Sequence, residues 1–197
     1  MMRIAVFWSE LPSYAVACVR EILTRQSLEV TIVRYSHRGE KPFEEALRIL
    51  ACPQHTISDQ EPKSKQWNTL SGILEAFQPD VGVISGWAIP AFNRAARWIK
   101  NAGGTMVCMS DNQWHGAVKQ RLGAVYAKLF FRRRYDAMFV PGERQRVFAR
   151  KCGFVGRRVI TGMYSCDWPL YASAHDRREE QFQGRWPEAF VFVGSLI

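Results

Sequence analysis

The chain has 197 residues and a hydrophobic share of 47%, which is enough for one large or two small domains with a packed core. Lys and Arg number 27 against 18 acidic residues, so the net charge of +9 favours an anionic partner such as a nucleotide, a phosphorylated substrate or a membrane surface. The five cysteines lack CxxC spacing and no apolar run is long enough for a signal peptide or a membrane span, which argues against a disulfide framework, a zinc site and a transmembrane protein.

The N-terminal part predicts a strand, a helix and a second strand. The unbroken apolar run at residues 4–8 is typical of a central parallel strand, and residues 30–33 predict the next strand. Between them Pro12 suits the first turn of a helix, and helical spacing of apolar residues follows. Residues 37–41 then predict a polar turn, and residues 43–50 predict a short helix.

The middle of the chain predicts further alternation. Residues 52–66 are polar and predict a loop, with one short strand around residues 56–57. A helical stripe follows, and the apolar residues 81–85 and 105–109 predict strands on either side of a helix that begins at Pro90. The inward side of that helix is expected to carry Phe92, Ala95, Ala96 and Ile99.

The C-terminal part predicts a long helix at residues 117–133 and two strands, at 136–140 and 158–161, with a helix between them. Residues 168–184 are polar, charged and typical of a linker. Residues 190–193 are apolar and predict a strand that opens a second unit of strands and helices.

Alternating strands and helices predict an α/β fold, a Rossmann-like doubly wound parallel sheet with right-handed crossovers. In the common strand order 3-2-1-4-5-6 the first and fourth strands are neighbours, and ligands bind in the crevice between them. We count residues 105–109 as the fourth strand, so the turn at 9–14 and the loop at 111–116 are expected to border this crevice. The candidate ligand-contacting residues at this edge of the sheet are Ser9, Glu10, Pro12, Ser13, Tyr14, Gly86, Trp87, Asn112, Trp114, Gly142, Glu143, Tyr164 and Ser165.

The loop at residues 109–116 combines an acid, two amides, an indole and an imidazole. A turn that only reverses the chain does not need Trp and His, whereas a pocket floor needs a few polar groups on a stacking surface. Asp111 and His115 are therefore the candidate catalytic residues. The alternative is that Asp111 or Asn112 caps the following helix and Trp114 packs under it.

Several common motifs are absent from the sequence. There is no GxGxxG after the first strand, no P-loop and no GxSxG nucleophile elbow, which disfavours dinucleotide binding, P-loop chemistry and an esterase mechanism. The four histidines show no paired spacing for a metal, so neither a metal nor a tightly bound cofactor is expected.

The order of these segments resembles the N-terminal domain of a GT-B glycosyltransferase, and most closely the retaining glycosyltransferase family 4. The segments that carry the resemblance are residues 2–8, 110–116, 136–142 and 159–167, and residues 190–196 resemble the strand and turn that open the family's donor-binding domain. The turn after the first strand departs from the family because it has Pro12-Ser13 where a glycine pair is usual.

The resemblance implies transfer of a sugar from a nucleotide-sugar donor to an acceptor in a cleft between two Rossmann-like domains. Residues 1–167 would be the acceptor-side domain, 168–188 a linker and 189–197 the start of a truncated donor-binding domain. The chain alone would then lack the donor site and be inactive. His115 is the nearest match to a family histidine near the transferred sugar, with Asp111 as its rival.

Other roles are weighed beside this one. The chain could be a non-catalytic Rossmann-like binding module that docks a partner chain, or could self-associate through the strand at 190–193. Around Lys128 to Arg134 the helix alternates basic and aromatic residues, which suits the anionic inner face of a membrane for an otherwise cytoplasmic protein; the alternative is a helix whose apolar side faces the core. Nucleic acid is disfavoured because no known binding fold accompanies these cations.

Overall fold

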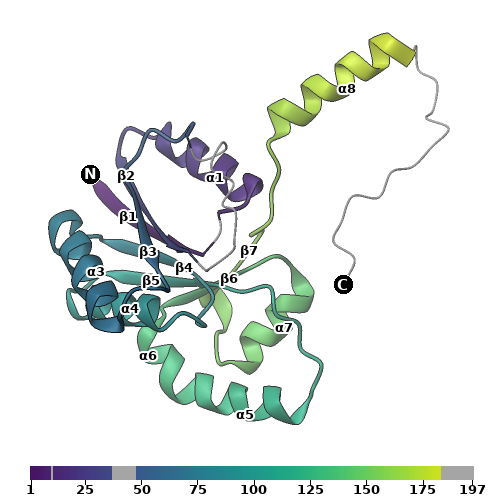
Figure 1. Ribbon diagram of the computed structural model, residues 1–197. Helices are drawn as coiled ribbons and strands as arrows, with labels where there is room; N and C mark the ends of the chain where they lie inside the picture. Colours follow the sequence, from purple (N-terminus) through teal and green to yellow (C-terminus); the bar gives the residue numbers. More distant parts are fainter. Residues whose placement is uncertain (10, 37–47, 183–197) are drawn as a thin grey trace. The chain divides into compact units, whose positions relative to one another are not determined.

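The computed structural model describes residues 1–9, 11–36 and 48–182 (Figure 1). The chain divides into two units at Ser165, Met1–Ser165 and Cys166–Ile197. Glu10, the turn at 37–41, most of the helix expected at 43–50 and the strand expected at 190–193 lie outside the described residues. The strands of the first unit are β1 Met2–Trp8, β2 Leu28–Ser36, β3 Gln54–Ser58, β4 Val81–Ser85, β5 Thr105–Met109, β6 Ala137–Val140 and β7 Val159–Thr161.

The main helices of the first unit are α1 Ser13–Leu23, α3 Lys63–Phe77, α4 Pro90–Asn101, α5 Val118–Tyr126 and α7 Glu143–Lys151. Helix α5 continues through a π-helical turn, Ala127–Phe131, into the short α6, Arg132–Arg134, and a 3-10 turn, Gly156–Arg158, precedes β7. In the second unit the segment with linker-like composition contains a helix, α8 Trp168–Phe182. None of the helices in the described ranges is long and apolar enough to cross a membrane.

The sheet confirms the predicted fold class. Its seven strands run in the order β3-β2-β1-β4-β5-β6-β7, and every neighbouring pair is parallel, as in a doubly wound Rossmann-like domain. Helix α1 lies on one face and α3 to α7 lie on the other (Figure 1). The carboxyl ends of all seven strands therefore meet at one edge of the sheet, where the loops of a binding site can converge.

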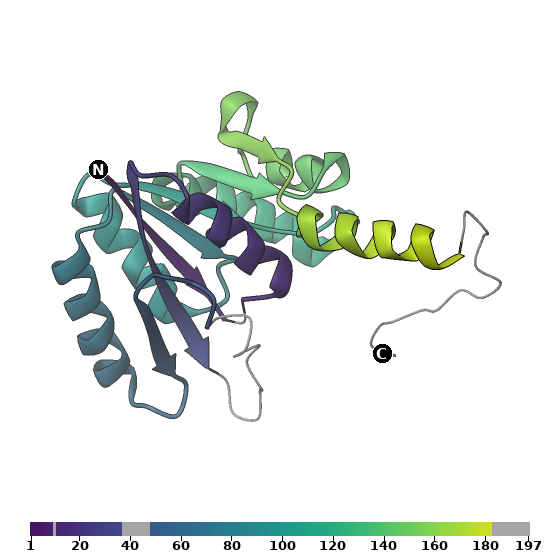
Figure 2. The ribbon, with the colours of Figure 1, turned by 90° about the horizontal axis from the view of Figure 1, so that it is seen from above.

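The two faces of the sheet bury separate apolar clusters. Phe7 packs among the buried residues of α3, α4 and α7, whereas its neighbour Val6 packs under α1, because successive strand residues point to opposite faces. Figure 2 looks down on the face that carries α1. The four inward residues expected on α4 are all buried, which confirms the predicted register of that helix.

The strand count needs one correction. Gln54–Ser58 is a full strand that pairs with β2, so the neighbour of β1 at the reversal point is β4, Val81–Ser85, and not Thr105–Met109. The short strand expected around residues 56–57 is present and longer than predicted, but it was left out of the strand count, because Ile57 is the only residue of β3 that is both apolar and buried. The loop at residues 111–116 follows β5, one strand further from the reversal, although it leaves the same edge of the sheet as the turn after β1.

Candidate active site

Three loops bring their polar side chains together at the carboxyl edge of the sheet. The hydroxyl of Tyr164, three residues after β7, donates a hydrogen bond of 2.9 Å to Oδ2 of Asp111, two residues after β5. The Tyr164 ring also meets the ring of Tyr14, at the start of α1, edge-on with centroids 5.2 Å apart. The structure thus joins three of the residues singled out in the sequence, and we name Tyr14, Asp111 and Tyr164 the tyrosine–aspartate cluster.

A second contact connects the same loops. Cys18 Sγ and Ser165 Oγ lie 3.0 Å apart and share a hydrogen bond, which links α1 to the segment after β7. Ser165 was a sequence candidate and Cys18 was not. The signal for Cys18 is its place one helical turn after Tyr14, since residues four apart lie on the same side of a helix.

Both phenols of the tyrosine–aspartate cluster hold their protons firmly. Burial raises the pKa of Tyr164, and the hydrogen bond to the Asp111 carboxylate and its negative charge raise that pKa further. Burial also raises the pKa of Tyr14, with added contributions from the charges of Asp111 and Cys18, while its hydrogen bond with Tyr164 acts in the opposite direction. At neutral pH both phenols are therefore protonated, and Tyr164 uses its proton in the hydrogen bond to Asp111.

An apolar groove of about 300 Å³ lies beside this cluster on the α1 face of the sheet. Tyr14, Cys18 and Met163 form its rim next to the cluster, and strand side chains such as Val83 form its floor. Ser85 follows Val83 at period two, so it points to the same face, at the end of β4 where the sheet order reverses. Its Oγ is buried and has no hydrogen-bond partner among the described residues.

A second cavity, of about 430 Å³, lies under α5. It is lined by Trp87 and Asn112, two sequence candidates, together with Lys119 and Gln120. The Trp87 ring is fixed against Phe131, with centroids 5.0 Å apart, and is stacked on Phe148. This cavity combines a rigid aromatic wall with amide and ammonium groups, as small-molecule sites often do.

The loop before α5 owes its shape to Gln120, a residue that the sequence did not single out. Its Nε2 donates to the carbonyl of Gln113 at 2.7 Å, and its Oε1 accepts from the backbone N–H groups of His115 and Gly116 at 2.7 and 3.1 Å. The sequence offered one weak indication of this role, which is that Gln120 is a polar residue in the first turn of the helix that follows a polar loop.

The capping alternative for this loop is wrong in part. Helix α5 begins after Ala117 and has no side-chain cap, so neither Asp111 nor Asn112 caps it. Trp114 does pack against the main core, and the Lys151 ammonium lies 5.6 Å from the centre of its ring. The His115 side chain is exposed and makes no hydrogen bond or ion pair within the described part of the chain, whereas Asp111 lies in the tyrosine–aspartate cluster.

The remaining sequence candidates have local roles at the same edge. Ser9 and Pro12 are half-buried in the turn after β1, and Pro12 is the N-cap of α1. The side chain of Ser13, at the start of α1, is not described. Gly142 precedes α7, and Glu143 forms an ion pair of 2.8 Å with Arg146.

Gly86 makes the turn after β4 with a φ of +78°, a conformation that favours glycine. Within the described ranges no group of three or more His, Cys, Asp or Glu residues could hold a metal ion. The polar groups at this edge include the hydroxyls of Tyr14 and Tyr164, the carboxylate of Asp111 and the ammonium of Lys119.

Comparisons with known proteins agree with this architecture. No protein-family model and no curated protein sequence matches the chain. Among solved structures, UDP-GlcNAc 2-epimerase from Methanocaldococcus jannaschii is similar, with a TM-score of 0.59 and 13% identity over 81% of this chain and 45% of that chain. At this identity the similarity shows the fold, a Rossmann-like domain of the GT-B type, and does not single out glycosyltransferase family 4. The chain spans less than half the length of that protein.

Proposed function

We propose that this chain is the acceptor-side Rossmann-like domain of a glycosyltransferase that uses a nucleotide-sugar donor. The observation that carries the proposal is the tyrosine–aspartate cluster at the carboxyl edge of a parallel sheet, where open α/β sheets bind their ligands. The similarity in fold between this chain and UDP-GlcNAc 2-epimerase also supports a nucleotide-sugar substrate.

The cluster has chemistry that suits an acceptor hydroxyl. A carboxylate accepts hydrogen bonds and can take a proton, so Asp111 is the group proposed to orient and deprotonate the attacking hydroxyl. The phenols of Tyr14 and Tyr164 donate hydrogen bonds, and their edge-on rings give an aromatic surface for a sugar ring. His115 is the second proposed catalytic residue, on the strength of the family resemblance.

The similar solved structure favours one competing function, which is epimerisation of a nucleotide-sugar. A transferase moves the sugar to a second molecule, whereas an epimerase changes the sugar without an acceptor. The two functions therefore differ in their need for an acceptor and in the product that carries the sugar.

The test uses the protein encoded by the complete reading frame that contains this chain. We would incubate it with a panel of nucleotide-sugars labelled in the sugar, with and without aqueous and lipid extracts as sources of acceptor, and separate the products by chromatography. The proposal predicts that label leaves the nucleotide only when an acceptor source is present. An altered nucleotide-sugar formed without acceptor would contradict it, and so would a panel in which every donor remains unchanged.

A further inference from the structure

Helix α5 and its continuation expose their apolar side. Val118, Leu122, Val125 and Leu129 follow one another at intervals of four, three and four residues, so they form a single stripe along the helix. Their exposed fractions are 73, 68, 57 and 59%, although each is a residue that normally seeks burial. We name these four residues the α5 stripe.

The opposite side of the same helix supplies the contacts with the core. Ala124, Ala127 and Phe131 are buried, and the Phe131 ring packs on Trp87 and on Tyr135. The α5 stripe is therefore not the core-facing side, and the alternative of a helix whose apolar side faces the core is wrong. Tyr126 and Phe130, whose rings lie 4.7 Å apart, are also about half exposed and widen the apolar surface.

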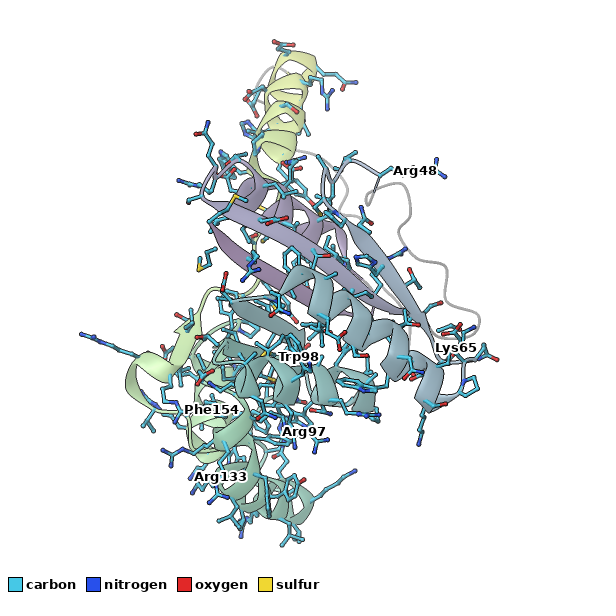
Figure 3. The ribbon with its side chains drawn as sticks, turned by 90° about the vertical axis from the view of Figure 1, so that its left-hand side faces the viewer. Arg48, Lys65, Arg97, Trp98, Arg133 and Phe154 are labelled. Atoms are coloured by element: carbon cyan, nitrogen blue, oxygen red, sulfur yellow. The ribbon has the colours of Figure 1, made fainter. Side chains whose placement is uncertain are left out.

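Cations flank the stripe, and acidic residues are absent from this segment. Residues 117–134 contain six Lys and Arg residues and no Asp or Glu. At about 100° per residue, Arg121 and Lys128 fall on one side of the stripe and Lys119 falls on the other. Arg133, at the end of the helical run, is labelled in Figure 3. Arg134 instead donates a hydrogen bond of 3.1 Å to Oδ1 of Asn93, which links the C-terminal end of this helical segment to α4.

We propose that the α5 stripe docks this domain on the surface of an anionic lipid bilayer, with the helix lying in the plane of the interface. Leu, Val and aromatic side chains would enter the boundary between headgroups and acyl chains, and the flanking cations would meet lipid phosphates. A second copy of the chain is a poor occupant, because it would bring an equal set of uncompensated cations against the first.

Docking in this orientation has a consequence for the cavity under α5. Lys119, Gly123 and Tyr126 line that cavity, and they belong to the helix that carries the stripe. The cavity would then lie beside the lipid headgroups, within reach of a substrate that is anchored in the membrane.

The test is co-flotation of the chain with vesicles of phosphatidylcholine, either pure or mixed with phosphatidylglycerol. We expect binding to the anionic vesicles only, and a loss of that binding as salt is raised, because salt screens the attraction between cations and headgroups. Leu129→Ser should weaken the binding about tenfold, from loss of one inserted apolar side chain. Lys128→Gln should weaken it about fivefold, from loss of one cation near the surface.

Ile49→Ser is the matched control, because Ile49 is 57% exposed but precedes β3, which lies four strands from β5 in the sheet, whereas α5 follows β5. It should bind as tightly as the unchanged chain, and urea unfolding of each variant checks that the fold is kept. Negligible binding to both kinds of vesicle would overturn the proposal. Equal binding to neutral and anionic vesicles would overturn it as well, and so would self-association in sedimentation that Leu129→Ser abolishes.

Discussion

Replacing Asp111 by Asn, in the protein encoded by the complete reading frame, is expected to lower kcat for sugar transfer about 100-fold. The amide has the size of the carboxylate and can still accept the hydrogen bond from Tyr164, so the cluster should keep its shape. What the variant loses is the negative charge and the ability to take a proton. KM for the donor should change little, because the substitution lies on the proposed acceptor side.

Glu75→Gln supplies the matched control, since Glu75 is an exposed carboxylate on α3 that makes no contact with the cluster. It should transfer sugar at the wild-type rate. His115→Ala is measured in parallel, and the outcome decides between the two catalytic candidates. A variant Asp111→Asn with wild-type kcat, alongside a slow His115→Ala, would move the proposed catalytic role from Asp111 to His115.

Replacing Phe92 by Ala is expected to destabilise the domain by about 3–5 kcal/mol. Phe92 is 1% exposed on α4, and its ring lies 5.5 Å from Phe7 of β1 and 5.8 Å from Tyr35 of β2. Removal of the ring leaves a cavity between α4 and the centre of the sheet, which the rigid surroundings fill only in part. Urea unfolding followed by circular dichroism measures the loss.

Phe130→Ala makes the same chemical change at an exposed position, because 49% of Phe130 is accessible beside the α5 stripe. It should cost less than about 1 kcal/mol, as surface substitutions generally do. Equal losses in the two variants would mean that the outer side of α5 is buried in the folded domain, which would remove the basis of the membrane proposal.

The sheet was largely predictable because six of its seven strands contain a short, mostly apolar run. β3 was the exception, since Ile57 is its one buried apolar residue and the rest of the strand resembles a loop. Because this strand was not counted, Thr105–Met109 was expected to lie next to β1, whereas β4 occupies that position. Pattern alone does not show whether a polar edge strand pairs.

The site was predictable to the level of loops but not of contacts. Parallel strands end at one edge, which was enough to place Asp111 and Tyr164 on the same edge. Their hydrogen bond joins residues 53 positions apart, and its formation depends on the path of two loops that no local pattern describes. Gln120 was missed for a related reason, because its role arises from the loop that folds back over it.

Helix α5 shows a third limit. Its periodicity correctly places Val118, Leu122, Val125 and Leu129 on one side, but periodicity does not say whether that side faces the core. The small residues Ala124 and Ala127 allow the other side to approach the sheet closely, and Phe131 then fills the space against Trp87. Packing volume, which the spacing of apolar residues does not encode, decided the orientation.

We infer that the tyrosine–aspartate cluster binds a sugar, and NMR of the isotopically labelled chain can test this inference. Methyl glycosides of glucose, galactose and N-acetylglucosamine serve as probes, added stepwise while backbone amide shifts are recorded. We expect saturable shifts for at least one glycoside, grouped at Tyr14, Asp111 and Tyr164. Saturable shifts grouped instead around the pocket between Tyr35, Trp67 and Arg94, or no saturable shift with any glycoside, would contradict it.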